Sequence, residues 1–273
     1  MSVCRLKRAL VTGALFCLCL PLNSPAAQLC PASAIAESVV VKHISDGDSL
    51  RLEDGRKLRL IGINAPELAR DNHPADALGV DARSTITQLL RQSHNRISLQ
   101  YGAERQDKYQ RTLAHVYLSD GRSLQASLIE LGMATAFTTP PNDEHSACYR
   151  AVEQIAIQQR RGVWALDDYQ LKRVSQLQTS DNGFRRIVGK VSRVQTTADA
   201  TWIMLDEKLK VRIAKNDRIF FQSSQLQQLQ GKTIEIRGWL HSSRPSGQQP
   251  PYFMQLRHPD AIHELDSTPP AMK

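Results

Sequence analysis

Two stretches of this chain show the same order of alternating and helical segments, and that order constrains the fold more than any other feature. Alternation of apolar and polar residues marks a strand with one buried face, whereas apolar spacings of three and four mark a helix. The first stretch predicts three strands, a helix and two further strands, at 39–41, 49–52, 57–63, 80–92, 96–101 and 112–118. An Asp54-Gly55 turn separates the second strand from the third.

The second stretch repeats this order without repeating the residues. It predicts three strands, a short helical segment and two strands, at 187–194, 201–205, 209–213, 223–230, 233–240 and 252–256. This is the element order of a five-stranded Greek-key OB barrel. The first half adds helices at 124–131 and 143–161, the latter with Asn142 as its cap. The predicted class is therefore α+β, mainly β: a five-stranded OB-type barrel with three helices, followed by a second small OB-like barrel.

The N-terminal segment has the layout of a secretory signal peptide. Basic residues Arg5, Lys7 and Arg8 precede an apolar run at 9–22, and small residues at 24–27 offer a cleavage point. The run is too short to span a bilayer comfortably, although an uncleaved membrane anchor is the alternative. We therefore expect a periplasmic or secreted monomer with no stable membrane association after cleavage.

A polar segment divides the rest of the chain. Residues 170–182 lack apolar periodicity, which predicts a linker between the barrels. The expected division is a signal peptide (1–27), a first domain (36–168), the linker (169–183), a second barrel (184–265) and a flexible tail (266–273).

Charge and cysteine content suit an exported protein that meets a polyanion. The chain has 35 Lys and Arg residues against 27 Asp and Glu residues, a formal net charge of +8. Loss of the signal segment removes three basic residues and leaves +5 (32 against 27), an excess that favours nucleic acid without establishing it. Of five cysteines only Cys30 and Cys148 then remain, as a candidate disulfide or as two unpaired thiols.

Asp46-Gly47-Asp48 places two carboxylates one residue apart. Such carboxylates repel each other unless a cation or a basic neighbour lies between them, and hard oxygen ligands suit calcium or magnesium. An ordinary Asp-Gly turn has the same composition, so this motif alone does not establish a metal site.

Several motifs in one order carry a resemblance to a known family. They are Asp46-Gly47-Asp48, the segment RLIGINAPE at 59–67, the segment DKYQRTLA at 107–114, Phe137, Pro140-Pro141-Asn142 and the segment RGVW at 161–164. Together they resemble the thermonuclease (staphylococcal-nuclease-like) family over about residues 39–164. The resemblance implies a calcium-dependent nuclease that cleaves DNA and RNA with limited sequence preference.

The resemblance also implies a metal site. Asp48 matches the principal calcium-ligating aspartate, and Asp46 lies where a second carboxylate supports the metal. Asn64 matches a second ligating aspartate, and Ala65 matches a residue that ligates through its backbone carbonyl. Asn64 departs from the family pattern, and because an amide oxygen carries no formal charge, calcium should bind more weakly.

The remaining matches imply the catalytic and substrate-binding groups. Glu67 matches the general base or water-orienting glutamate. Arg59 and Arg111 match two arginines that bracket the scissile phosphate, where planar guanidiniums stabilise charge that develops in the transition state. Lys108, Tyr109 and Phe137 match positions that line the nucleotide pocket. Two further departures are Thr139, where a second pocket aromatic is usual, and Gln110, where a glycine is usual.

The second barrel has no such group of residues, but it is basic and contains aromatics such as Trp202 and Trp239. A barrel of this kind can hold single-stranded nucleic acid; alternatively, Trp239 and Phe253 pack in the core and the charges form a solvated surface. We therefore expect an exported metal-dependent endonuclease or phosphodiesterase that acts on DNA, RNA or both. The alternatives are a non-catalytic tandem OB-fold module that binds nucleic acid or protein, and a cell-envelope module that uses the fold as a scaffold.

Overall fold

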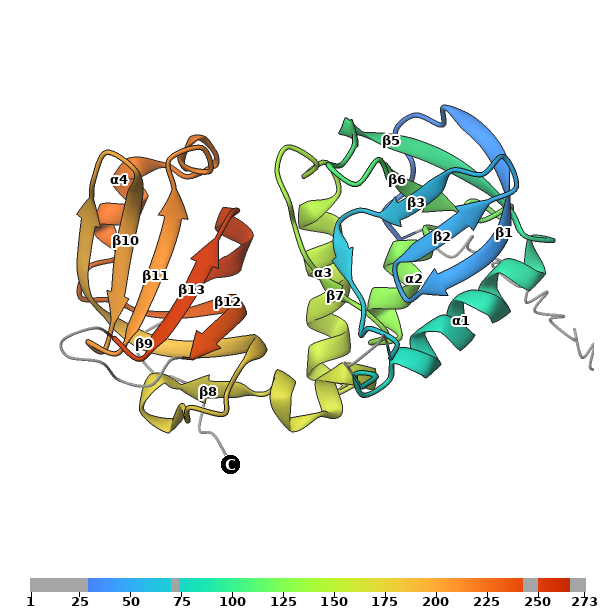
Figure 1. Ribbon diagram of the computed structural model, residues 1–273. Helices are drawn as coiled ribbons and strands as arrows, with labels where there is room; N and C mark the ends of the chain where they lie inside the picture. The colour runs from blue at the N-terminus through green and yellow to red at the C-terminus, as the bar shows by residue number, and fades with distance from the viewer. Residues whose placement is uncertain (1–28, 70–73, 243–249, 266–273) are drawn as a thin grey trace, which may run out of the picture.

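The computed structural model describes residues 29–69, 74–242 and 250–265, which form two five-stranded barrels (Figure 1). The predicted fold class is confirmed. The expected signal peptide (1–27) and flexible tail (266–273) lie outside the described residues. Within the described ranges, no helix is long and apolar enough to cross a membrane.

The first barrel consists of β1 (Glu37–Asp46), β2 (Ser49–Leu52), β3 (Lys57–Leu60), β5 (Arg96–Gln106) and β6 (Thr112–Tyr117). It closes in the order β1-β2-β3-β6-β5, with β3 and β6 parallel and the other neighbours antiparallel. Alternate residues such as Leu52, Leu58 and Leu99 point inward and are fully buried. The hydrophobic alternation that predicted these strands therefore also builds the core.

Three helices accompany this barrel: α1 (Gly79–Gln92), α2 (Leu124–Glu130) and α3 (Ser146–Gln158). Two short strands, β4 (Ile63–Asn64) and β7 (Thr135–Ala136), form a separate small sheet. The α1 helix buries Ile86, Leu89 and Leu90, three of the four apolar positions whose spacing predicted it, whereas the fourth, Val80, is 66% exposed. The β4 strand pairs with β7, so the end of the β3–β4 segment is fixed beside the chain that leads into α3.

The expected Asn142 cap of the third helix is wrong. The Asn142 side chain instead bonds Glu104, accepting from its N–H (2.8 Å) and donating to its carbonyl (3.1 Å). Because the side chain is committed to β5, the helix begins only at Ser146, after His145.

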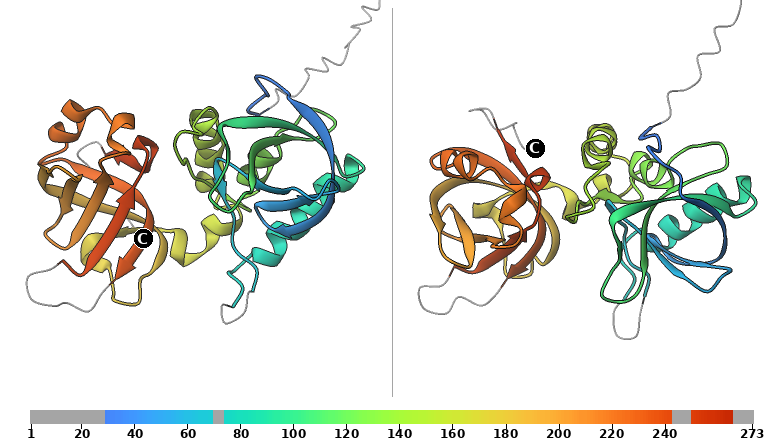
Figure 2. Two further views of the ribbon diagram at one scale, coloured as in Figure 1. Left: turned by 45° about the horizontal axis from the view of Figure 1, so that its top comes forward. Right: turned by 90° about the horizontal axis from the view of Figure 1, so that it is seen from above.

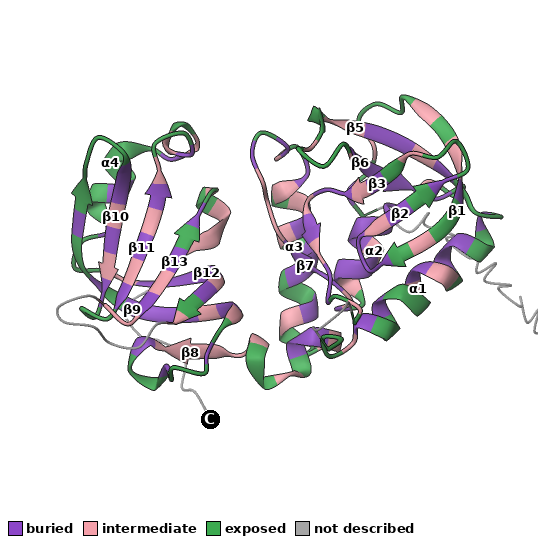
Figure 3. Cartoon of the chain, viewed as in Figure 1, coloured by how far each residue is buried: buried purple, intermediate pink, exposed green. Residues whose placement is uncertain are grey.

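The second barrel consists of β9 (Gly183–Thr196), β10 (Ala200–Leu205), β11 (Leu209–Ala214), β12 (Thr233–Ser242) and β13 (Tyr252–Leu256), with α4 (Ser223–Gln228) between β11 and β12. Its strands follow the order β12-β13-β11-β10-β9, and pairing of β9 with β12 closes the ring. Buried and less buried residues alternate along β10 and β11 (Figure 3). The inner face therefore forms a core of its own, and the outer face is left for solvent or a ligand.

The expected linker at 169–183 is part of the second domain. Within it, β8 (Leu171–Arg173) pairs in parallel with β9. Val174 and Leu177 are buried in the core of the second barrel. The segment lacks periodicity because it contributes only isolated apolar contacts, so its sequence looks like a solvated connection.

The two domains share a packed interface, in which α3 lies between the barrels (Figure 2). A hydrophobic cluster joins Trp164 of the first domain to Phe184 of the second, and Trp239 packs against it. Glu153 of α3 is fully buried and receives Arg237 of β12, with Nη2 2.8 Å from Oε1. A buried ion pair and an apolar cluster therefore fix the second barrel against α3.

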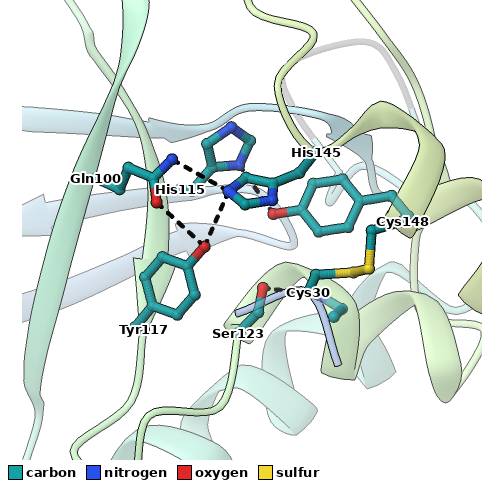
Figure 4. The surroundings of a disulfide bond; sticks show 9 residues. Cys30, Gln100, His115, Tyr117, Ser123, His145 and Cys148 are labelled. Carbon is teal, nitrogen blue, oxygen red and sulfur yellow. Dashed lines mark hydrogen bonds between the residues drawn. A yellow bond between two sulfur atoms is a disulfide. The ribbon is translucent and has the colours of Figure 1, made fainter. Parts of the chain in front are cut away.

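The structure contains a disulfide between Cys30 and Cys148, whose Cα atoms lie 5.6 Å apart (Figure 4). It connects the segment before β1 to α3. Two buried histidines lie beside it: His145 contacts Tyr117 and Gln100, and His115 contacts the Tyr149 hydroxyl (2.8 Å). Burial, together with the charge of His145, lowers the pKa of His115 to about 3.

Candidate active site

The carboxylates of the Asp-Gly-Asp motif lie in the tight connection between β1 and β2. Both Asp46 and Asp48 are more than 90% buried. The Asp48 N–H donates to Asp46 Oδ1 (3.1 Å), and the Ser49 hydroxyl donates to Asp48 Oδ1 (3.0 Å). A Cβ on Gly47 would lie 2.5 Å from the Cβ of Ala65, so only glycine permits this close approach. The connection between β1 and β2 therefore packs directly against Ala65, which follows β4.

Arg59 of β3 connects the two sides of this site. Its Nη1 pairs with Asp48 Oδ2, and its Nη2 donates to the carbonyl of Ile63 (3.1 Å). Burial and, to a smaller extent, the charge of Arg111 lower the pKa of Arg59 to about 10, and the charges of Asp46 and Glu67 oppose the decrease. Arg59 therefore lies within electrostatic reach of a second guanidinium and of several carboxylates.

Asn64 and Ala65 lie beside Asp48. The Ala65 N–H donates to Asp48 Oδ2 (3.3 Å), and the Asn64 amide donates to the Ala65 carbonyl (3.4 Å). The carboxylate, the side-chain amide and the carbonyl are therefore neighbours, and all three carry the hard oxygens that calcium accepts. Among the described residues, no group of three or more His, Cys, Asp or Glu forms a metal cluster. A cation here would thus depend on the amide and carbonyl oxygens as well as on carboxylate.

Glu67 and Arg111 face a common cavity of about 430 Å³, which Lys57 and Tyr109 also line. Arg111 is held by Asp107, whose Oδ2 lies 2.7 Å from its Nε. The guanidinium also borders a second cavity, of about 240 Å³, together with Asp46. Arg111 therefore lines both the cavity that Glu67 borders and the cavity that Asp46 borders.

The backbone of Glu67 is fixed by the start of α1. Its N–H donates to Asp76 Oδ2 (2.9 Å), and its carbonyl accepts from the Asp76 N–H (2.9 Å). Gly79 lies directly against this carbonyl, since a Cβ there would lie 2.4 Å from the oxygen. Glu67 is thus positioned by two elements while it borders the cavity.

The three residues expected to line a nucleotide pocket are divided between two places. Tyr109 is largely exposed, and its ring lies 5.0 Å from the Lys108 ammonium and 5.6 Å from the Arg111 guanidinium carbon. Phe137 instead packs edge to face on Trp239 of the second barrel, with the ring centroids 5.0 Å apart. It lines a cavity of about 170 Å³ between the domains, which Trp239 and Arg150 also line.

Sequence reasoning missed two residues that position or extend this site. Lys57 shares the cavity with Glu67, and Asp107 holds Arg111. Signals for both were present: Lys57 and Arg59 are two residues apart on a strand and so share a face, and Asp107 precedes Arg111 in a turn.

Comparison with known proteins gives one consistent result. Residues 57–166 match the family model described as staphylococcal nuclease homologue. The chain is 34% identical over 131 residues to the thermonuclease of Staphylococcus intermedius, covering 47% of this chain and 76% of that protein. It is 29% identical over 136 residues to the endonuclease YncB of Bacillus subtilis, covering 48% of this chain and 64% of that protein. A match to the B. subtilis endonuclease YhcR is 26% identical over 211 residues, 72% of this chain and 17% of that protein.

Proposed function

Because this chain belongs to the staphylococcal nuclease family, we propose that it is an exported, calcium-dependent endonuclease that hydrolyses phosphodiester bonds of DNA, RNA or both. Its relatives are named thermonuclease and endonuclease, and they support a nuclease.

The observation that supports catalysis best is the approach of two guanidiniums. The charge of Arg111 contributes to the lowered pKa of Arg59, so the two cations lie within electrostatic range of each other. A phosphodiester between them would replace this repulsion with two attractions. Guanidinium forks also match the geometry of phosphate oxygens, and they stabilise the charge that grows there in the transition state.

Glu67 is the proposed group that takes or directs the proton of the attacking water. It borders the same open cavity as Arg111, where a water and a phosphate can both be admitted. A carboxylate within hydrogen-bond reach of a water can act as a general base. Lys57 and Tyr109 would bind the neighbouring part of the substrate, with Lys108 beside the Tyr109 ring.

Asp48, Asn64 and Ala65 are the proposed calcium ligands, with Asp46 supporting them. The three residues are neighbours and carry oxygens of the kind that calcium accepts, although Asn64 lowers the negative charge available to hold the ion. Bound calcium would polarise a phosphoryl oxygen and lower the pKa of a water.

The proposal of export rests on the signal-peptide pattern of residues 1–27. The Cys30–Cys148 disulfide supports it, because such bonds persist mainly in oxidising compartments such as the periplasm and the extracellular space.

The test is cleavage of single-stranded DNA, duplex DNA and RNA by the purified mature protein, with calcium or with a chelator. We expect calcium-dependent cleavage that Glu67→Gln lowers by about 10²–10⁴-fold, as for loss of a general base. Glu53→Gln, a change of the same kind at an exposed residue of the first barrel, should retain full activity.

Two outcomes would contradict the proposal. Full activity in the presence of the chelator would exclude calcium dependence, and full activity of Glu67→Gln would remove Glu67 from the reaction. Binding of nucleic acid without cleavage under any metal would instead favour the non-catalytic module. Asn64→Asp would then test whether the missing carboxylate accounts for the lack of activity.

A further inference from the structure

The outer face of the second barrel carries two rows of side chains that cross neighbouring strands. Strand pairing places Trp202 opposite Gln195 and Arg212, and Arg212 opposite Gln255. The second row joins Met204, Lys210 and Phe253 in the same way, with Arg193 at one end and His241 at the other. We call these two rows the outer face.

The outer face is separate from the barrel core. Its residues alternate with Ile203, Val211 and Met254, which are fully buried (Figure 3). Trp202 and Phe253 themselves are only partly buried and belong to none of the hydrophobic clusters formed by the described residues. The alternative that Phe253 packs in the barrel core is therefore wrong, and Trp239 packs against the interdomain cluster, whereas Tyr252 is a core residue.

Charge and aromatic surface are combined on this face. The Lys210 ammonium lies 4.1 Å from the centre of the Trp202 ring, and the Arg212 guanidinium carbon lies 6.0 Å from it. A cavity of about 260 Å³ beside the ring is lined also by Arg193 and Gln195. Neither row contains Asp or Glu. The face thus offers a ring to stack on and cations on either side of it.

This face continues into the space between the domains. Gln255 and His241, the ends of the two rows, also line the interdomain cavity. Its opposite wall is formed by Arg150 and Phe137 of the first domain, and β13 is on the side of the second barrel that faces that domain (Figure 1). The Phe137 N–H donates to the Gly62 carbonyl (2.9 Å), one residue before the carbonyl that binds Arg59. The interdomain cavity, which the outer face reaches at Gln255 and His241, is therefore lined by a residue bonded to the segment that also binds Arg59.

We propose that the outer face binds single-stranded nucleic acid and delivers it through the interdomain cavity to the nuclease site. The proposal rests on the proposed nuclease function and adds a substrate-binding surface on the second barrel. Bases stack on Trp202 and Phe253, while Arg193, Lys210 and Arg212 contact phosphates. A duplex keeps its bases stacked on one another, so it cannot offer them to these rings, and single strands are preferred.

The test is the binding of a labelled single strand of about 20 nucleotides to the full mature protein, measured by fluorescence anisotropy with a chelator to prevent hydrolysis. We expect Trp202→Ala to weaken binding about tenfold, as for loss of one stacked base, and Trp202→Phe to bind nearly as the wild type. The matched duplex should bind more weakly to the wild type, and Trp202→Ala should change that binding little.

The role of the cations is tested by salt dependence. Lys210→Gln/Arg212→Gln should reduce the slope of log K against log salt by about 1.4, the value for two lost phosphate contacts on a single strand. The control Lys215→Gln/Lys232→Gln removes the same charge from exposed lysines of the same domain and should leave the slope unchanged. Wild-type binding by Trp202→Ala, or equal effects of the two double variants, would overturn the proposal.

Catalysis on a short substrate separates this proposal from the nuclease function. A dinucleotide is too short to reach the outer face, so Trp202→Ala should cleave it at the wild-type rate while its KM for the long strand rises. If the wild type cleaves nothing, the nuclease proposal fails, and the binding measurements still decide whether the outer face holds a single strand.

Discussion

The two barrels have the same strand order and the same closure, but they place their charged residues differently. In the first, Arg59 on the third strand is partly buried on the outer side of the barrel and pairs with Asp48. In the second, Arg212 on the third strand also points outward, but it contacts Gln255 (3.3 Å). In the first barrel, partly buried charges that face each other form the proposed reactive site, whereas in the second, outward cations beside an aromatic ring form the proposed binding surface. One topology therefore supports two kinds of chemistry.

The largest expected difference between the barrels concerns the disulfide. Its cysteines are 118 residues apart, and closing so long a loop restricts the unfolded chain. Cys30→Ala/Cys148→Ala should therefore lower the free energy of unfolding of the first barrel by up to about 5 kcal/mol. The measurement is urea unfolding followed separately in the two domains by hydrogen exchange; equal destabilisation of the second barrel would show that the domains unfold as one unit.

The same substitution in the two barrels should affect different quantities. Arg59→Ala should lower kcat about a thousandfold, about 4 kcal/mol, because it removes charge stabilisation from the transition state. Arg212→Ala, the matched change on the second barrel, should leave kcat on a dinucleotide unchanged. Steady-state kinetics with the short substrate measure both, and similar kcat values for the two variants would remove the distinction between reactive and binding arginines.

The interface between the barrels should depend on its buried ion pair. Burial raises the pKa of Glu153 to about 7, and the charge of Arg150 opposes this increase. At pH 8 the carboxyl is ionised, so Arg237→Met should cost about 3 kcal/mol by leaving a buried charge poorly paired. Arg257→Met breaks a more exposed pair with Asp217 (3.4 Å) and should cost less than about 1 kcal/mol. Thermal unfolding at pH 8 measures the loss of stability in each variant. If Arg237→Met costs no more than Arg257→Met, the domains are held by the apolar cluster alone.

The smallest expected effect is the pH dependence of the first barrel. Burial, with a contribution from His145, lowers the pKa of His115 from 6.5 to about 3, so between these values the unfolded state binds more protons than the folded state. The contribution of His115 to the free energy of unfolding is therefore fully present well above pH 6.5. It is lost as the pH falls, by about 0.7 kcal/mol between pH 7 and pH 6. His115→Gln should flatten this slope in urea unfolding series, whereas the exposed control His43→Gln should retain it.

Much of the fold could be predicted because both barrels are built from local alternation. Most strands expected in the two stretches are present, but the one expected at 57–63 is divided into β3 and β4, and β1 extends well beyond 39–41 because it pairs with both β2 and β5. The start of α3 and the packing of 169–183 could not be predicted. Asn142 bonds a distant strand, and Val174 and Leu177 enter a core whose other residues come later in the chain.

The sequence by itself determined the element order and the identity of the motif residues. Both depend only on the identity and spacing of residues along the chain, which the sequence contains in full. Only the tertiary structure decided that Arg59 and Arg111 act on each other, that Phe137 meets Trp239 and that Glu153 receives Arg237. Those contacts join residues from separate strands and domains, and their distances follow from how two closed barrels pack, which no local pattern encodes.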